Sequence, residues 1–134
     1  GYTEHEHLMV AAIARYHRRS LPKKRHESWQ LIDGRAARQT VAAMALLLRL
    51  AAALDRRPQA VIQALQVRAA APVKDALRPL TIALVPQPGS SGQAPADLSL
   101  ERWSLAGCSG AVAEASGAAL SVSVAEPAIA LTAP

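Results

Sequence analysis

The chain has 134 residues, a length that suits one domain of ordinary size or a small domain with an attached subdomain. Apolar residues make up 51% of it, enough for a hydrophobic core, so we expect the chain to fold. The net charge of +5 is uneven: residues 1–60 carry +6 (eleven Lys and Arg against five Asp and Glu), and residues 61–134 carry −1 (four against five). A basic first half favours anionic partners, whether phosphate chains, nucleic acid or acidic protein, without choosing among them.

The same sequence argues against a secreted or membrane protein. No segment has the charged, apolar and small-residue zones of a signal peptide. The longest apolar stretch, residues 41–54, is too short for a bilayer and contains Arg49. The single Cys108 can form no internal disulfide, which agrees with a reducing compartment. We predict a cytoplasmic location with no membrane contact, and the absence of an initiator Met before Gly1 predicts a piece of a longer protein.

A helix is predicted from Thr3 onward. Thr3 and Glu6 form a capping box, in which each side chain satisfies an amide at the helix start. One buried stripe follows at three- and four-residue spacing: Leu8, Met9, Ala12, Ile13 and Tyr16. We expect this helix to end near Arg19, because Pro22 cannot continue it.

Residues 21–34 read as a basic loop, with Trp29 and Leu31 as its anchors on the core. The strongest helical pattern follows at residues 35–57, where apolar residues occur all round the helix and predict that it is buried. A boundary is expected at Pro58. The predicted organisation is therefore a helical portion at 1–58, a small α+β subdomain at 59–126 and a loosely ordered tail at 127–134.

In the second half the apolar period changes from helical to alternating, which predicts four short strands. Their apolar positions are Leu65 and Val67; Leu80, Ile82 and Leu84; Leu98 and Leu100; and Leu120, Val122 and Val124. A helix before the last strand is capped by Ser104 and closed by Gly117 in the left-handed conformation. The order is then strand, strand, strand, helix, strand, with residues 86–95 as a hairpin loop. The predicted fold class is α+β.

A cluster of cations lies at the end of the first helix and in the loop after it. Its members are Arg15, His17, Arg18 and Arg19, followed by Lys23, Lys24 and Arg25. Guanidinium groups match phosphate oxygens two at a time, so the cluster can form an anion clamp. The alternative is a solvated basic face that keeps the protein soluble.

Other polar residues carry weaker signals. Arg49 lies within an apolar helix and must find a carboxylate, a carbonyl or a bound anion. His17 has no neighbour that completes a metal site, and Asp55 is expected to pair with Arg56 or another nearby cation. No Gly-rich phosphate loop, nucleophile elbow, paired-carboxylate motif or CxxC is present, so we predict neither catalytic residues nor a metal site.

Three segments taken together resemble a known family. Glu6–Ala11, Ala14–Arg19 and Leu48–Arg56, with the later Leu100–Leu105 and Gly117, are similar to the C-terminal region of the exopolyphosphatase and guanosine pentaphosphate phosphohydrolase (Ppx/GppA) family. The resemblance implies a helical portion like the HD phosphohydrolase fold. It also places the catalytic centre in two upstream domains of the actin-like ATPase fold. His17 and Asp55 stand where later elements of an HD fold would contribute, but its paired His-Asp element would precede Gly1.

The resemblance thus implies a non-catalytic accessory domain of an exopolyphosphatase. Its predicted ligand is inorganic polyphosphate or guanosine pentaphosphate, held by Arg15, His17, Arg18, Arg19, Lys23, Lys24, Arg25 and Arg49. The implied partners are the upstream catalytic domains and a second copy in a homodimer. Mg²⁺ is implied for the whole enzyme, and no cofactor for this fragment. Two alternatives stay open, a polyanion or nucleic-acid module and a purely structural dimerisation domain, although few aromatic residues are available to stack bases.

Overall fold

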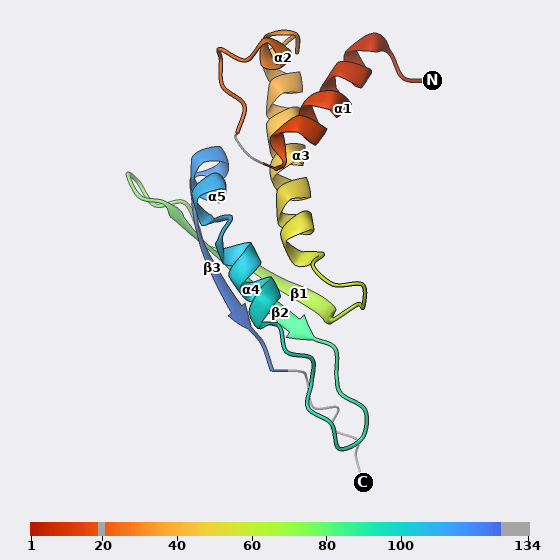
Figure 1. Ribbon diagram of the computed structural model, residues 1–134. Coiled ribbons are helices and arrows are strands. Elements are labelled where there is room, and N and C mark those ends of the chain that lie inside the picture. The colour runs from red at the N-terminus through yellow and green to blue at the C-terminus, as the bar shows by residue number, and fades with distance from the viewer. Residues whose placement is uncertain (19–20, 127–134) are drawn as a thin grey trace.

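The computed structural model describes residues 1–18 and 21–126, and it is built from five helices and three strands in those ranges (Figure 1). In chain order the elements are α1 (Glu4–Tyr16), α2 (Glu27–Gln30), α3 (Arg35–Leu54), β1 (Ile62–Ala69), β2 (Arg78–Pro86), α4 (Ser99–Ala106), α5 (Ser109–Ser116) and β3 (Ala118–Val124). The α+β class is confirmed. The predicted tail at 127–134 lies outside the described residues.

The capping box at the start of α1 is confirmed. Thr3 Oγ1 accepts a hydrogen bond from the Glu6 amide at 3.2 Å, and the Thr3 amide donates to Glu6 Oε2 at 2.7 Å. The helix ends at Tyr16, earlier than the predicted end near Arg19. The reason is tertiary, because the Arg49 side chain binds the carbonyls of Tyr16 and His17 at this end.

A first core cluster joins α1, α2 and α3. Ala12 and Tyr16 are buried in it, as the apolar stripe predicted, together with Ile32, Val41 and Ala45. The prediction for the basic loop was partly wrong. Trp29 does pack against the cluster, but Leu31 is 52% exposed and the adjacent Ile32 is buried. The short helix α2, which the sequence pattern did not predict, sets which of these two side chains faces inward.

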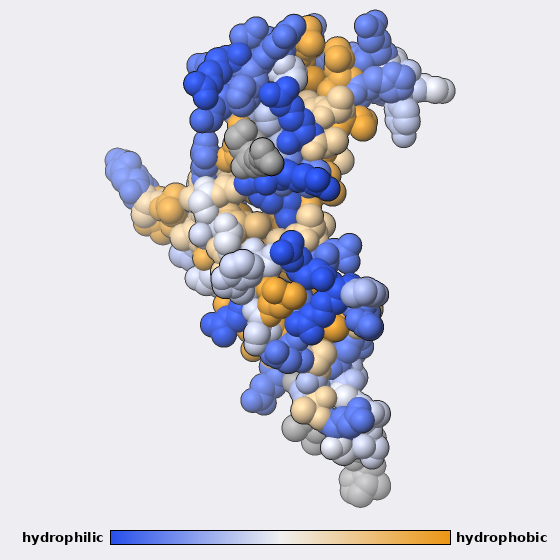
Figure 2. Space-filling view, viewed as in Figure 1, coloured by the Kyte–Doolittle hydropathy of each residue, from blue (hydrophilic) through white to orange (hydrophobic). Residues whose placement is uncertain are grey.

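Helix α3 ends at Leu54, short of the predicted Arg57, and it is not buried all round. Its fully buried residues are Val41, Ala45 and Ala53, whereas Met44, Leu47 and Leu48 expose 49%, 64% and 40% of their surface. The prediction of a buried helix was therefore wrong for one face. Hydrophobic residues also reach the surface over α1 and the adjoining part of α3 in Figure 2.

The three strands form one mixed sheet in the order β1-β2-β3. Strand β1 is antiparallel to β2, with Leu65 opposite Leu84 and Val67 opposite Ile82. Strand β3 is parallel to β2, so the chain crosses from one to the other through α4 and α5. These three strands were predicted correctly.

The predicted strand at Leu98 and Leu100 was wrong, because Leu98 is the N-cap residue of α4 and Leu100 lies inside that helix. The observed order is strand, strand, helix, helix, strand, and residues 86–95 lead from β2 into α4 instead of forming a hairpin loop. Buried residues in this region follow helical spacing: Leu98, Glu101, Leu105, Cys108 and Val112. The strand prediction depended on Leu98 and Leu100 alone, and two alternating residues are too short a pattern to distinguish a strand from a helix.

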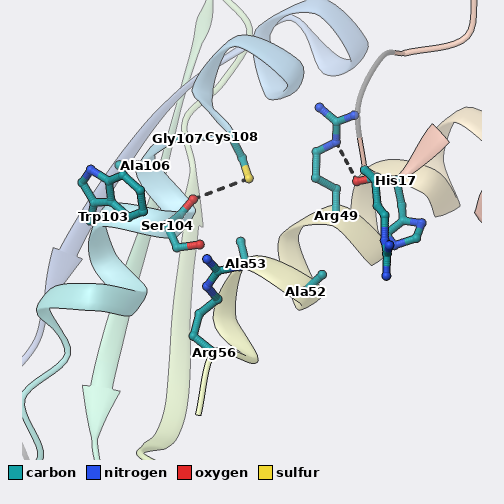
Figure 3. A pocket seen from close by; sticks show the side chains of 11 residues that line it. His17, Arg49, Ala52, Ala53, Arg56, Trp103, Ser104, Ala106, Gly107 and Cys108 are labelled. Atoms are coloured by element: carbon teal, nitrogen blue, oxygen red, sulfur yellow. Dashed lines mark hydrogen bonds between the residues drawn. The ribbon is translucent and has the colours of Figure 1, made fainter. Parts of the chain in front are cut away.

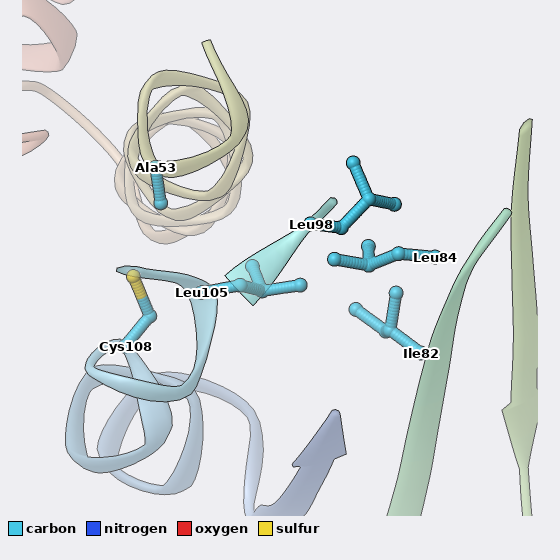
Figure 4. Packing of buried hydrophobic residues seen from close by; sticks show 6 residues of the cluster. All are labelled: Ala53, Ile82, Leu84, Leu98, Leu105 and Cys108. Atoms are coloured by element: carbon cyan, nitrogen blue, oxygen red, sulfur yellow. The ribbon is translucent and has the colours of Figure 1, made fainter. Parts of the chain in front are cut away.

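The single helix predicted between Ser104 and Gly117 is two helices, α4 and α5, which meet at Gly107 and Cys108. Gly117 does close α5 in the left-handed conformation, with φ of 65°. A second core cluster lies between these helices, the end of α3 and the sheet (Figure 4). Its buried members are Ala53, Ile82, Leu84, Leu98, Leu105 and Cys108. Helix α3 therefore contributes to both cores.

By length and composition α3 alone, among the described helices, could cross a membrane, with a mean hydropathy of 1.4 over its most apolar window. The core helices of soluble proteins meet the same test. Arg49 lies in this helix, and its side chain donates hydrogen bonds to two backbone carbonyls at the end of α1. The length and apolar composition of α3 are therefore weak evidence for a membrane span, and we interpret α3 as a helix of the folded domain.

Candidate anion-binding pocket

A pocket of about 910 Å³ lies where α3 passes between the end of α1 and the turn that joins α4 to α5 (Figure 3). Its polar lining is dominated by basic side chains: His17, Arg18, Arg49 and Arg56. None of the described residues that line it is acidic. Figure 2 shows hydrophilic residues gathered where α1 ends beside α3. Three guanidinium groups without a carboxylate among them favour an anionic ligand.

Arg49 is held in place by the end of α1. Its Nε donates to the His17 carbonyl at 3.0 Å, and its Nη2 donates to the Tyr16 carbonyl at 3.1 Å. These carbonyls lie at the C-terminal end of a helix, where the helix dipole favours a cation. The sequence required a carboxylate, a carbonyl or an anion for Arg49, and the structure supplies carbonyls. A guanidinium group has five N–H donors, so donors remain for a ligand in the pocket.

His17 and Arg18 approach the pocket from the end of α1. The His17 Nδ1 lies 2.6 Å from the Ala14 carbonyl, which requires a proton on Nδ1 and leaves Nε2 available in the neutral ring. Arg18 is exposed and lines the same pocket as Arg49. Two of the predicted cations are thus brought beside a third that is more than thirty residues away in sequence.

Sequence reasoning missed Arg56 and Trp103 as pocket residues. Arg56 is seven residues after Arg49, a spacing that would have placed both on one face of the helix predicted for residues 35–57, although α3 ends two residues before Arg56. Trp103 projects from α4 and is 71% exposed. No local pattern marked Trp103, because its approach to α3 depends on the crossover from β2 to β3.

Of the other predicted cations, those that the structure describes do not line this pocket. Arg15 lies over the Tyr16 ring, with 5.6 Å between its guanidinium carbon and the ring centroid. Lys24 lines a separate pocket at the start of α3, and Lys23 and Arg25 are exposed in the loop. Arg19 lies outside the described residues. The described members of the predicted row of cations therefore do not share one pocket.

The pocket also contains one thiol. The Cys108 Sγ donates to the Ser104 carbonyl at 3.8 Å, and Cys108 is 8% exposed. Burial raises the pKa of this thiol, while the nearby positive charge of Arg49 opposes that shift in part. A protonated thiol is a poor nucleophile, and the side chain of Cys108 packs in the second core cluster.

Among the residues that the structure describes, Asp55 forms no ion pair, contrary to the prediction. Among the described residues the ion pair in this region joins Arg57 Nη2 to Glu101 Oε1 at 2.8 Å. Glu101 is completely buried, and neither of its oxygens accepts a hydrogen bond of regular geometry. We interpret the contact as a close ion pair with poorly aligned N–H groups. It joins the segment after α3 to α4.

The described residues contain no group of three or more His, Cys, Asp or Glu side chains placed to hold a metal ion. The lining of the pocket is cationic, whereas Mg²⁺ requires carboxylate and other oxygen ligands. The pocket residues therefore do not fit Mg²⁺, and the metal expected for the whole enzyme stays a prediction about other parts of the protein.

Comparison with known proteins identifies the family. Residues 1–86 match the family model described as Ppx/GppA phosphatase, domain III, which is well over half of the chain. The chain belongs to the Ppx/GppA phosphatase family. No curated protein and no solved structure matches it.

The match to this Ppx/GppA domain III begins at Gly1 and ends at Pro86, the last residue of β2. It therefore includes α1, α3 and the first two strands, and with them Arg18, Arg49 and Arg56. The segment from Leu100 to Leu105 and Gly117, which also resembled the family, lies beyond the matched residues. The chain is thus a C-terminal domain of an exopolyphosphatase-family protein. Because this family is soluble, it also argues against a membrane role for α3.

Proposed function

We propose that this Ppx/GppA domain III is a non-catalytic accessory domain that binds a phosphate chain in the pocket between α1, α3 and α4. The observation that carries the proposal is the placement of Arg18, Arg49 and Arg56 around one pocket with no acidic residue in its described lining. The charge offsets that of successive phosphates, and the planar guanidinium groups bind phosphate oxygens in pairs.

Arg49 gives this pocket a rigid element. Its side chain is part-buried and is anchored to two carbonyls, so little conformational entropy is lost when a phosphate binds to its free donors. Arg18 and Arg56 flank it from the end of α1 and the end of α3. Together they would keep a long anion in place while other domains of the protein perform the hydrolysis. The cytoplasmic location remains part of this proposal.

The test is calorimetric titration of the chain with long-chain polyphosphate, at low and at moderate salt. Guanosine pentaphosphate and duplex DNA, at equal phosphate, serve as competing ligands. We expect polyphosphate to bind most tightly, with an affinity that falls as salt screens the arginines. Preference for duplex DNA would favour the nucleic-acid alternative, and no binding at low salt would contradict the proposal.

Variants locate the site. Arg56→Ala should weaken polyphosphate binding by at least about tenfold, because a charge-assisted hydrogen bond is worth about 1.5–3 kcal/mol and 1.4 kcal/mol corresponds to about tenfold. Arg102→Ala is the matched control, since Arg102 is exposed on α4 and does not line this pocket. Equal losses in the two variants would mean that net charge, and not the pocket, accounts for the binding.

A further inference from the structure

Among the described residues that line the pocket between α1, α3 and α4, His17 is the side chain that can change charge near neutral pH. The other basic members are arginines, which keep their charge throughout this range. Burial raises the pKa of the Cys108 thiol, so this group stays neutral there. An imidazole ring, by contrast, ordinarily gains or loses a proton between about pH 5 and 8. His17 is therefore the residue through which pH can act on this pocket.

The end of α1 fixes the position of the first proton on the His17 ring. His17 is the C-cap residue of α1, and its Nδ1 lies 2.6 Å from the Ala14 carbonyl. A carbonyl oxygen only accepts hydrogen bonds, so Nδ1 carries a proton in both charge states of the ring. The Arg49 Nε also donates to the His17 carbonyl, at 3.0 Å, and holds the backbone at this point (Figure 3). Titration of His17 therefore takes place at Nε2.

A phosphate chain distinguishes the two charge states of Nε2. In the neutral ring Nε2 has a lone pair and no hydrogen, so it cannot donate to a phosphate oxygen. In the charged ring Nε2 is an N–H donor, and its hydrogen bond to a phosphate is assisted by charge. The phosphates inside a polyphosphate chain are strong acids without a proton near neutral pH, so the chain cannot donate to Nε2 instead. Only the charged ring can hydrogen-bond to such a ligand through Nε2.

We infer that binding of a phosphate chain in this pocket adds a proton from the solvent to Nε2 of His17. The inference rests on the proposed function of the same pocket. Titratable and charged groups from each element around the pocket share it with the ring: Arg18, Arg49, Arg56 and Cys108. The described lining contains no carboxylate, so a bound chain supplies the negative charge that favours the protonated ring. Binding thus adds a fourth positive charge to those of the three arginines.

Proton uptake makes the affinity for the phosphate chain depend on pH. An ordinary imidazole is about one-tenth charged at pH 7.5, so complete protonation in the complex takes up nearly one proton. Between pH 8 and pH 6 we expect a mean uptake of at least about 0.5 proton per protein chain bound. By linkage, this mean over two pH units makes binding at least about tenfold tighter at pH 6 than at pH 8. Phosphate chains should therefore be held most firmly in mildly acidic solution.

The first test needs no variant. The 134-residue chain is titrated calorimetrically with long-chain polyphosphate at pH 7.5 and low salt, in buffers that differ in their enthalpy of ionisation. The slope of the observed binding enthalpy against the ionisation enthalpy of the buffer gives the number of protons taken up, which we expect to be about 0.5 or more. Binding without proton uptake overturns this inference and leaves the proposed function standing. Absence of binding, at pH 6 as well, overturns both.

Two variants locate the proton. His17→Gln keeps an N–H donor at every pH but cannot gain a charge, so its uptake should fall below about 0.1 proton. His7→Gln is the matched control and should keep the wild-type uptake, because His7 is exposed on α1 and does not line the pocket. Uptake that persists in His17→Gln, or that is lost equally in both variants, overturns the inference.

An NMR measurement on the wild-type chain decides the point if His17→Gln fails to fold or to bind. The ring resonances of His17 should move to the position of the charged imidazole when polyphosphate is added at pH 7.5, whereas those of His7 should stay in place. A His17 ring that remains neutral in the complex overturns the inference.

Discussion

Removal of Arg57 should destabilise the protein more than removal of an average surface arginine. Arg57 Nη2 lies 2.8 Å from an oxygen of Glu101, whose side chain is completely buried, while the Arg57 side chain is 30% exposed. Loss of one partner from a buried ion pair costs about 3–5 kcal/mol, because it leaves a charge without compensation. Partial exposure of Arg57 lets water reach the site and reduces this cost. For Arg57→Ala we expect a loss of about 2–3 kcal/mol in the free energy of unfolding.

The neighbouring Arg56 gives a matched control. It has no ion pair among the described residues, so Arg56→Ala should change the free energy of unfolding by less than about 0.5 kcal/mol. The assay is urea denaturation followed by Trp fluorescence, with the slope m checked for each variant. An unchanged m value means that the midpoint reports stability alone.

A double-mutant cycle then isolates the pair. Glu101→Gln removes the buried charge, so Arg57→Ala in that background should cost less than about 1 kcal/mol, the cost of losing side-chain packing. A cost for Arg57→Ala of under about 1 kcal/mol in the wild-type background would refute the reasoning, since exposed ion pairs have that value. The same conclusion would follow if the cost were equal in both backgrounds.

Two further predictions concern the pH dependence of stability and the end of α5. Burial, with added repulsion from Arg15 and neighbouring cations, lowers the pKa of His26 below its ordinary 6.5. The unfolded chain therefore binds more protons than the folded chain as the pH falls through 6.5, and the free energy of unfolding should decrease there. An NMR titration that finds a His26 pKa above 6.5 would contradict this prediction. Gly117→Ala should lower the free energy of unfolding by about 1–2 kcal/mol, because φ at Gly117 is +65°. Gly110→Ala, in open space within α5, should be neutral or stabilising. Equal melting temperatures for the two variants would contradict the assignment of the left-handed cap.

The family resemblance could be recognised from the sequence, and so could three basic residues of the pocket, but the pocket itself could not. His17, Arg18 and Arg49 were predicted as ligand-binding residues, and all three line the pocket. Arg15 was predicted for the same site, yet it lies over the Tyr16 ring. Neighbours in sequence at a helix end point in different directions, and which of them reach one pocket depends on the helix that packs against them.

Local patterns were sufficient wherever a short-range interaction decides the structure. The Thr3 and Glu6 capping box, the left-handed Gly117 and the alternating strands 62–69, 78–86 and 118–124 depend on contacts or conformations within a few residues. By itself, therefore, the sequence determined the α+β class, the start of α1, the buried stripe of α1 and the basic character of the first half.

Only the tertiary structure decided which apolar residues are buried and which cations meet. Leu98 caps a helix and does not form a strand, because it packs with Leu105 and Cys108 between α3 and the sheet. α1 ends at Tyr16 because Arg49, distant in sequence, binds the carbonyls there. The first of these contacts depends on the crossover from β2 to β3, and the second depends on the packing of α1 against α3. A sequence pattern within a window of a few residues cannot indicate packing or hydrogen-bond partners that are distant in the chain.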